Sequence, residues 1–290
     1  MAARTRRSSS FSRDGLVFDV RDKGPGKGEA VVLLHGFPQD ATAWDPVTSR
    51  LHEAGLRTLA PDQRGYSPQA RPRGRRAYRM ALLVDDVLAL LDDRGLARAH
   101  VVGHDWGGAV AWALAGRHPE RVASLTVLST PHPAAFTAAL AGSQAIASWY
   151  MGAFQLPILP EVALSRALPR MLRGLPDASI ARYTRRMREP SALGAALGWY
   201  RAIPFSPPGG FGAVVVPTTY MWGARDPALR RRGAELTGRY VSGPYRFVEL
   251  DAGHWLPETR PTEVASAVVE QVTSVPSTPR VAARPMTDPG

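Results

Sequence analysis

The stretch of sequence that decides the fold is Val101-Val102-Gly103-His104-Asp105-Trp106-Gly107-Gly108. Residues 98–102, which end in Val101-Val102, predict a strand before it, and residues 109–117 after it predict a helix that ends before Pro119. The form Gly-x-Asp-x-Gly between a strand and a helix predicts a tight turn that holds the Asp105 side chain above the end of the strand. The glycines leave room for this turn, and the N-terminus of the following helix favours negative charge beside it.

Apolar runs and helical patterns alternate on both sides of this turn. Short strands are predicted at residues 31–34, 56–60, 98–102, 122–128, 214–222 and 246–250, and helices at residues 78–91, 109–117 and 262–272. This alternation predicts a mostly parallel, doubly wound α/β sheet with right-handed crossovers. Residues 134–212 contain helical stretches and prolines but no clear strand, so we expect a helical cap inserted into the sheet domain.

The chain therefore divides into five expected parts. A core, residues 14–133 and 213–274, carries the cap of residues 134–212, and a basic N-terminus (1–13) and a tail (275–290) are expected to be disordered. The N-terminus lacks the apolar stretch of a signal peptide, and no apolar run approaches the ~20 residues of a membrane span. The chain has no cysteine, which excludes disulfides and thiolate chemistry and fits the cytoplasmic location that we expect.

The charge of the chain raises a different class of function. There are 36 Lys and Arg residues against 25 Asp and Glu residues, a net charge of +11, which would suit a nucleic-acid or membrane-surface partner. The densest basic stretches, residues 71–76, 182–188 and 230–232, lie far apart in the sequence. Dispersed surface arginine explains the charge better, so we expect no nucleic-acid partner and no membrane partner, while a homodimer stays open.

The residue at the centre of the turn, Asp105, predicts nucleophilic catalysis of a particular kind. A serine there would need a base before it could attack an acyl carbon, whereas an aspartate is already ionised at neutral pH. Its natural target is a saturated carbon with an activatable leaving group, and the product would be an ester of the protein's own carboxylate. Water must then hydrolyse that ester, which requires a base and an oxyanion hole.

Both requirements have candidates in the sequence. The backbone N–H groups of Phe37 and Trp106 would form the oxyanion hole. Pro38 is expected in a fixed turn, with a cis peptide bond as one form, that aims the Phe37 amide. His254 follows the last predicted strand and is the expected base, and Asp226 follows the preceding strand and would orient it. This chain order of nucleophile, acid and histidine is the one found with this kind of turn.

Each of these residues also has a purely structural interpretation. Asp105 and Asp226 could cap helices, and a single histidine such as His254 is more often packed than catalytic. All three fall at strand ends in the required order beside an oxyanion motif, and this coincidence favours catalysis. The residues expected to line the substrate pocket are His35, Pro38, Trp199 and Trp255, and a hydrogen bond from His35 is also expected to hold the oxyanion loop. The residues expected to be only structural are Asp62, Asp85, Asp86, His104, His118 and His132.

From about residue 15 to residue 272 the sequence resembles the α/β-hydrolase-fold epoxide hydrolases, an Asp-nucleophile branch shared with the haloalkane dehalogenases. The matching stretches are residues 35–38, 62–67, 103–108 and 251–258. The resemblance implies the α/β-hydrolase fold. Sister families share the first, third and fourth stretches, so these establish the superfamily better than the substrate.

Two cap tyrosines are what the resemblance adds to the site. Epoxide hydrolases of this kind hold the epoxide oxygen with two tyrosine hydroxyls, and Tyr150 and Tyr200, each preceded by a tryptophan, look like those residues. Opening an epoxide generates an alkoxide, a poor leaving group, to which phenols with a reference pKa of about 10 can donate hydrogen bonds and a proton. The alternative is that the two Trp-Tyr pairs only pack against the core, with their hydroxyls reaching solvent.

The resemblance implies hydrolysis of a small hydrophobic epoxide to a vicinal diol, through an ester on Asp105 and water activated by His254, with no metal and no organic cofactor. Haloalkane dehalogenase is the rival hypothesis, since Trp106 could hold a halide. Those enzymes, however, commonly have Asn where this chain has Phe37, and they need no tyrosine pair. A non-catalytic ligand binder of the same fold is a third alternative. The intact triad argues against it, because a binder would be free to lose Asp105 or His254.

Overall fold

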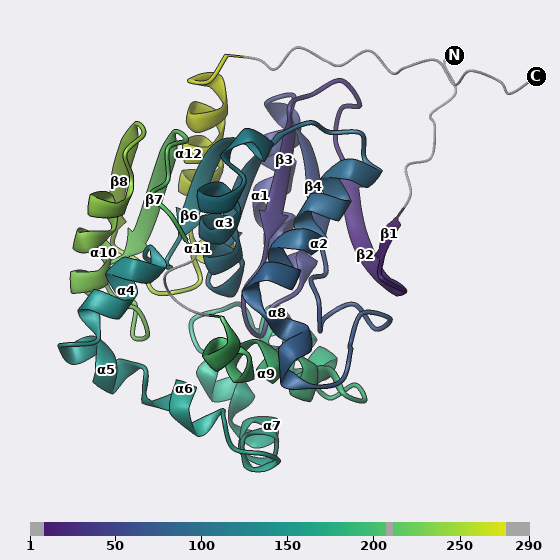
Figure 1. The fold of residues 1–290 in the computed structure, drawn as a ribbon, viewed down its shortest axis with the longest axis vertical. Coiled ribbons are helices and arrows are strands. Elements are labelled where there is room, and N and C mark those ends of the chain that lie inside the picture. Colours follow the sequence, from purple (N-terminus) through teal and green to yellow (C-terminus); the bar gives the residue numbers. More distant parts are fainter. Residues whose placement is uncertain (1–8, 207–210, 277–290) are drawn as a thin grey trace, which may run out of the picture.

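The computed structural model describes residues 9–206 and 211–276. Its described residues form one eight-stranded sheet (Figure 1) in the order β1-β2-β4-β3-β5-β6-β7-β8. The strands are β1 (Ser10–Arg13), β2 (Leu16–Lys23), β3 (Ala30–Leu34), β4 (Arg57–Pro61), β5 (Ala99–His104), β6 (Val122–Leu128), β7 (Thr218–Gly223) and β8 (Tyr245–Leu250). Only the pairings of β2 with β1 and β4 are antiparallel. The predicted mostly parallel sheet is confirmed.

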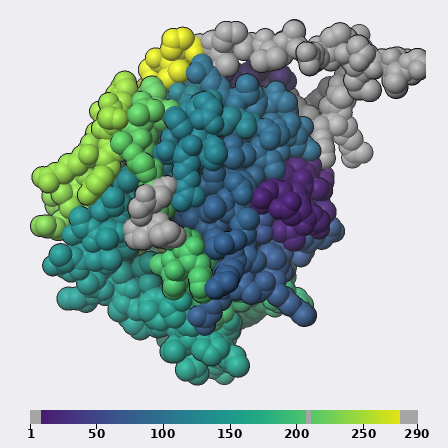
Figure 2. Space-filling view, viewed as in Figure 1, coloured from purple at the N-terminus to yellow at the C-terminus, as the bar shows by residue number. Residues whose placement is uncertain are grey.

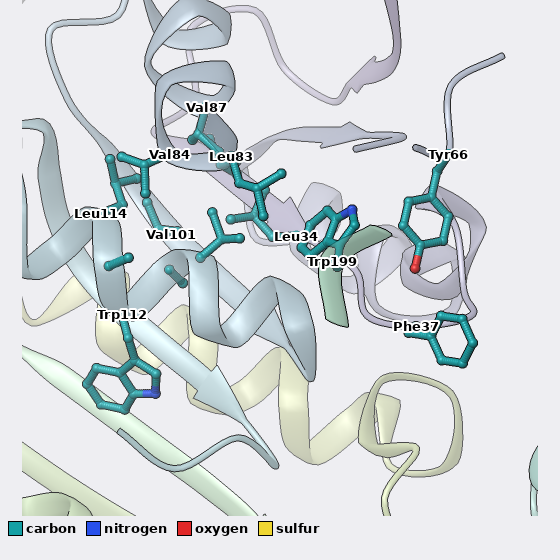
Figure 3. Packing of buried hydrophobic residues seen from close by; sticks show 14 of the residues in the cluster. Leu34, Phe37, Tyr66, Leu83, Val84, Val87, Val101, Trp112, Leu114 and Trp199 are labelled. Carbon is teal, nitrogen blue, oxygen red and sulfur yellow. The ribbon is translucent and has the colours of Figure 1, made fainter. Parts of the chain in front are cut away.

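Helices cover both faces of the sheet. One face packs against α2 (Met80–Asp93) and α3 (Trp106–Arg117), and the other against α1 (Asp45–Glu53) and α12 (Pro261–Thr273). Every residue of β3, β5, β6 and β7 is buried, as expected of strands between two helical layers. Figure 3 shows Leu34 and Val101 of adjacent strands near Leu83 and Val87 of α2.

The remaining elements outside the six cap helices described below are short. They are η1 (Ala41–Trp44), η2 (Arg75–Tyr78), η3 (Pro119–Arg121), η4 (Ile203–Phe205), α10 (Arg231–Leu236), η6 (Thr237–Tyr240) and α11 (Leu256–Thr259). Of these, α11 directly follows the loop that carries His254, and η1 follows the loop that carries Phe37. Both loops therefore lead from a strand of the sheet into a helical turn, which limits their freedom to move.

Six helices within residues 133–201 form the cap. They are α4 (Pro133–Ala139), α5 (Ser143–Ala147), α6 (Trp149–Ala153), α7 (Leu159–Met171), α8 (Asp177–Met187) and α9 (Ala192–Arg201). Figure 1 shows them below the sheet, and in Figure 2 the same teal and green segments close the lower side of the molecule. The expected helical content of residues 134–212 thus agrees with the described residues, while residues 207–210 lie outside them.

The structure differs from the sequence prediction at two boundaries. Residues 1–13 were expected to be disordered, but Ser10–Arg13 form strand β1, where Phe11 stacks on Phe18 of β2 with ring centroids 4.8 Å apart. The predicted strand at residues 214–222 begins only at Thr218, because Pro217 lacks the N–H group that a central strand must donate. Residues 1–8 and 277–290, where we expected disorder, lie outside the described residues.

Candidate active site

The turn at Asp105 has the form that the sequence pattern predicts. β5 ends at His104 and α3 begins at Trp106, and between them Asp105 has φ 51° and ψ −123°, a region that residues with a side chain rarely occupy. A Cβ atom on Gly103 would lie 2.4 Å from the carbonyl oxygen of Gly107. Glycine at that position is therefore required by the close approach of the chain to itself. Backbone strain of this kind is often found at functional sites.

Three side chains meet where the strands end. His254 places Nδ1 2.7 Å from Oδ2 of Asp226 and Nε2 3.6 Å from Oδ2 of Asp105. The other oxygen of Asp226, Oδ1, accepts hydrogen bonds from the amides of Ala228 and Leu229. Because the Asp226 carboxylate only accepts, Nδ1 of His254 carries a hydrogen and Nε2 faces Asp105. The structure thus brings together the three residues predicted as nucleophile, base and orienting acid.

The charges of these groups depend on one another. Burial would lower the pKa of His254, but the carboxylates of Asp226 and Asp105 raise it to about 10. Burial would likewise raise the pKa of Asp105, but the hydrogen bond and charge of His254, together with the Phe37 amide, hold it below its ordinary value. In the free protein Asp105 is therefore ionised and His254 is protonated. His254 can accept a proton only once Asp105 has lost its charge.

The loop after β3 brings a backbone donor to Asp105. The Phe37 N–H donates to Oδ1 of Asp105 at 2.8 Å, and the Phe37–Pro38 peptide bond is cis, one of the forms expected for Pro38. A Cβ atom on Gly36 would lie 2.3 Å from Cβ of Asp105, so glycine there allows the loop to approach this side chain. Trp106, the other predicted donor, occupies the first position of α3 directly after Asp105.

His35 lies behind this loop. Its Nε2 accepts a hydrogen bond from the Gln63 amide at 3.2 Å, and its Nδ1 lies 3.1 Å from the Gly36 carbonyl oxygen. Burial lowers the pKa of His35, so the ring is neutral and Nδ1 donates to that carbonyl. Both ring nitrogens are thus occupied by backbone groups. The structure places His35 as a support of the loop, the first of its two expected roles, rather than on the pocket side.

The two predicted cap tyrosines lie close together near Asp105. Tyr150 belongs to α6 and Tyr200 to α9, and their ring centroids are 6.1 Å apart. Tyr200 packs edge-on against Phe37 at 5.4 Å and against Trp106 at 5.0 Å. Burial raises the pKa of both phenols, and the Asp105 carboxylate contributes to each shift. Both hydroxyls are therefore protonated, and can act as donors, across the neutral pH range.

The two tryptophans predicted to line the pocket take different places. Trp199 donates its Nε1–H to the Arg64 carbonyl at 2.7 Å and packs edge-on against Trp106 at 5.8 Å, so it supports the wall formed by Trp106. Trp255 packs against the His254 ring at 4.8 Å. Together with His254 it lines a hollow of about 450 Å³, whose other walls include Met171 of the cap. The hollow gives His254 an opening between the cap and the core.

A buried chain of hydrogen bonds, not anticipated from the sequence, links the cap to His254. The Tyr183 hydroxyl of α8 donates to Glu258 Oε2 at 3.1 Å, and the Gln39 side chain lies 2.7 Å from the same oxygen. The other end of the Gln39 amide lies 2.9 Å from Nδ1 of His104, whose Nε2 lies 2.9 Å from the His254 carbonyl oxygen. His104 was expected to be only structural, and this chain makes it a support of the base.

The hydrogen bonds that link Tyr183 to His254 require one more proton than a neutral His104 and an ionised Glu258 would supply. The His254 carbonyl can only accept, so Nε2 of His104 carries a hydrogen. The Gln39 amide donates at its nitrogen and accepts at its oxygen. If His104 is neutral and Glu258 is ionised, however, both atoms beside the amide, Nδ1 of His104 and Oε2 of Glu258, are acceptors. Burial raises the pKa of Glu258, whereas burial and the charge of His254 lower that of His104 to about 4. Both shifts favour Glu258 as the site of that proton, with the Gln39 amide then turned to donate to Nδ1 of His104, the reverse of the orientation in which Nε2 of Gln39 donates to Glu258.

Comparison with known proteins identifies the family. Residues 29–261 match the alpha/beta hydrolase fold family. The chain belongs to this family. This α/β hydrolase is 34% identical to the AB hydrolase superfamily protein YfhM of Bacillus subtilis, over 89% of this chain and 94% of that protein. It is 33% identical to Epoxide hydrolase A of Mycobacterium tuberculosis, over 90% of this chain and 96% of that protein.

A solved structure agrees with these relatives. Epoxide Hydrolase A from Mycobacterium thermoresistibile superposes on this α/β hydrolase with a TM-score of 0.81 and 28% identity, over 93% of this chain and 98% of that one. The predicted α/β-hydrolase fold and the resemblance to epoxide hydrolases are confirmed, and the protein is a hydrolase. Within residues 9–206 and 211–276, no group of three or more His, Asp or Glu side chains is arranged to hold a metal ion.

Proposed function

We propose that this hydrolase opens a small hydrophobic epoxide to a vicinal diol. The observation that carries the proposal is the position of Tyr150 and Tyr200 beside Asp105, because it combines an ionised nucleophile with two protonated phenols. Attack on the saturated carbon of an epoxide requires both, since the departing oxygen stays on the same molecule and must be stabilised there. The relatives named epoxide hydrolases support the same substrate class.

The first step forms an ester. The Phe37 amide holds Oδ1 of Asp105, which leaves Oδ2 to attack an epoxide carbon. The carbon–oxygen bond of the ring breaks, and its electron pair goes to the oxygen that Tyr150 and Tyr200 hold. One phenol transfers its proton to that oxygen. The product is a hydroxyalkyl ester of Asp105, with Oδ1 now its carbonyl oxygen.

The second step hydrolyses the ester. Esterification removes one of the two negative charges that raise the pKa of His254, so His254 can give its proton to the phenolate left by the first step. Neutral His254, oriented by Asp226, then takes a proton from water as that water attacks the ester carbonyl. The Phe37 and Trp106 amides stabilise the oxyanion. The ester bond breaks and the departing diol oxygen takes the proton from His254. The new carboxylic acid of Asp105 then gives its remaining proton to His254, which restores the ionised Asp105 and the protonated His254 of the free protein.

Trapping the ester tests this proposal. The His254→Gln variant, incubated with styrene oxide and digested, should carry the mass of one substrate molecule on the peptide that contains Asp105, and the Asp105→Asn variant should carry none. The absence of an adduct and of diol from a panel of epoxides would refute the proposal. Halide release from a short bromoalkane without diol formation from styrene oxide would instead favour a dehalogenase. Against that alternative, the Trp106 ring packs edge-on against Tyr200, with ring centroids 5.0 Å apart.

A further inference from the structure

An apolar surface is exposed on the outer side of the cap. Six large hydrophobic side chains within residues 146–162 are 48–79% exposed: Ile146, Trp149, Leu156, Ile158, Leu159 and Val162. They belong to α5, α6, the following turn and α7, which Figure 1 shows in succession along the edge of the cap that lies farthest from the sheet. We call these six residues the cap surface. A soluble domain rarely exposes so many large apolar side chains in one segment unless the surface has a partner.

The backbone at the centre of the cap surface supports this interpretation. Ile158 has φ 66° and is 72% exposed. A β-branched residue in this left-handed region is a strained outlier, and no burial of its own side chain offsets that strain. Trp149 and Tyr150 are adjacent in the sequence but face different surroundings. Trp149 is 71% exposed, whereas Tyr150 lies inward, near Asp105.

The charges of the same segment select the kind of partner. Exposed Arg166, Arg170 and Arg173 lie on α7 and just after it. Residues 134–176 contain a single acidic residue, Glu161, whose carboxylate pairs with Arg201 at 2.6 Å. The cap surface is therefore apolar and flanked by positive charge. A second copy docked on it face to face would bring like charges together, whereas a surface of anionic lipid would attract the arginines.

We propose that the cap surface binds the interface of an anionic lipid membrane. Its apolar side chains would enter the boundary between head groups and acyl chains, with the arginines at the phosphates, as amphipathic surface segments do. This contact lies on the membrane and does not span it: no helix in the described part of the chain is long and apolar enough to cross a bilayer. We expected no membrane partner because no apolar run approaches a membrane span and because the basic stretches are dispersed, but neither observation bears on an exposed apolar surface flanked by arginines.

Such a contact has a consequence for the active site. Tyr150 follows Trp149 directly in α6, so a cap held at the membrane by Trp149 keeps one phenol of the site a single residue from the lipid boundary. Hydrophobic small molecules concentrate in lipid, and the cap would meet them there. Binding to vesicles can be measured without any substrate, so it succeeds or fails independently of the proposed epoxide hydrolysis.

Vesicle binding tests the proposal directly. The full-length protein should sediment with vesicles of phosphatidylcholine mixed with phosphatidylglycerol, much less with phosphatidylcholine alone, and less as salt concentration rises. Trp149 is the one strongly exposed tryptophan of the described residues, so brominated acyl chains should quench its fluorescence. The double variant Trp149→Ser/Ile158→Asn should lose both signals, while Val215→Ser, at an exposed apolar residue of the core, should retain them.

The arginines provide a second, graded test. Glutamine in place of Arg166, Arg170 or Arg173 should weaken binding to anionic vesicles about fivefold for each residue, which corresponds to ~1 kcal/mol per arginine near a charged membrane surface. Circular dichroism should show that each variant folds. No binding to anionic vesicles would overturn the proposal. So would a dimer in light scattering that the double variant converts to a monomer, because the cap surface would then be an interface between two copies.

Discussion

Replacing Asp226 by asparagine should separate the two chemical steps. Asp226 accepts from Nδ1 of His254 at 2.7 Å through Oδ2, and from the amides of Ala228 and Leu229 at 2.8 and 3.0 Å through Oδ1. In the Asp226→Asn variant the side-chain oxygen is kept in place by the two amides, so the NH₂ group faces His254 and donates to Nδ1. The hydrogen of neutral His254 then sits on Nε2, the nitrogen that must accept a proton from water.

The expected size of the effect follows from this geometry. Ester formation should change little, because Asp105 attacks and His254 does not. Ester hydrolysis should fall about ten-thousand-fold, the loss seen when the same tautomer is imposed on the histidine of a serine protease triad. That factor corresponds to ~5 kcal/mol of barrier.

Rapid quenching followed by intact-protein mass spectrometry measures both steps. With excess epoxide the Asp226→Asn variant should accumulate about one ester per protein molecule in the time of one wild-type turnover, and then form diol very slowly. Asp251→Asn is the matched control. Asp251 lies on the same loop as His254, but its carboxylate is exposed and pairs with Arg225 instead. A folded Asp226→Asn variant that turns over many times without accumulating ester would refute the assignment of Asp226 and His254 to the water step.

Three further predictions follow from the site. Tyr150→Phe and Tyr200→Phe should each slow ester formation at least about a hundredfold in single-turnover kinetics, because each removes a donor to the epoxide oxygen; an unchanged rate in both would remove the basis of the epoxide assignment. Glu258→Gln, which mimics the protonated acid, should keep the neutral-pH rate of ester hydrolysis, whereas Glu258→Ala should lose about tenfold through the broken hydrogen-bond chain; equal rates in the two variants would contradict that role. The raised pKa of His254 stabilises the fold fully below about pH 6.5, and this contribution is lost as pH rises through about 10. Denaturant titrations should show that decline in the wild type and a smaller one in Asp226→Asn, and parallel pH profiles would argue against it.

Much of the fold could be predicted because the central strands are buried on both faces. β3 consists of unbroken apolar residues, and β6 is interrupted only by Ser124 and Thr126. The predicted positions of both strands are confirmed within one residue. β1 and β2 escaped prediction because polar residues are interspersed along both strands, at the antiparallel end of the sheet, so their pattern does not differ from that of a loop. The start of β7 was misplaced because apolar composition continues through Pro217, where the hydrogen-bonding capacity of the chain changes.

The candidate site was predictable where a local motif fixes geometry. Asp105 lies in a turn whose neighbouring glycines are visible in the sequence, and the chain order then singles out Asp226 and His254. The hydrogen-bond chain through Gln39, His104 and Glu258 was not predictable, because it joins three segments that only the folded sheet brings together. Glu258 is the last residue of the matching stretch 251–258, but nothing in that stretch indicates which residues form hydrogen bonds with it. Tyr150 and Tyr200 were predicted from the resemblance to epoxide hydrolases, since their spacing alone does not distinguish them from tyrosines that only pack in the cap.

The measurement that tests the central claim most directly is a single turnover in water labelled with the heavy isotope of oxygen. With protein in excess over an epoxide, the oxygen added to the diol comes from Asp105 if the ester forms. The account predicts that the first diol is unlabelled and that the heavy oxygen is found in the peptide containing Asp105. Heavy oxygen in the first diol, with none in Asp105, would mean that water attacks the epoxide directly, and it would contradict the ester mechanism.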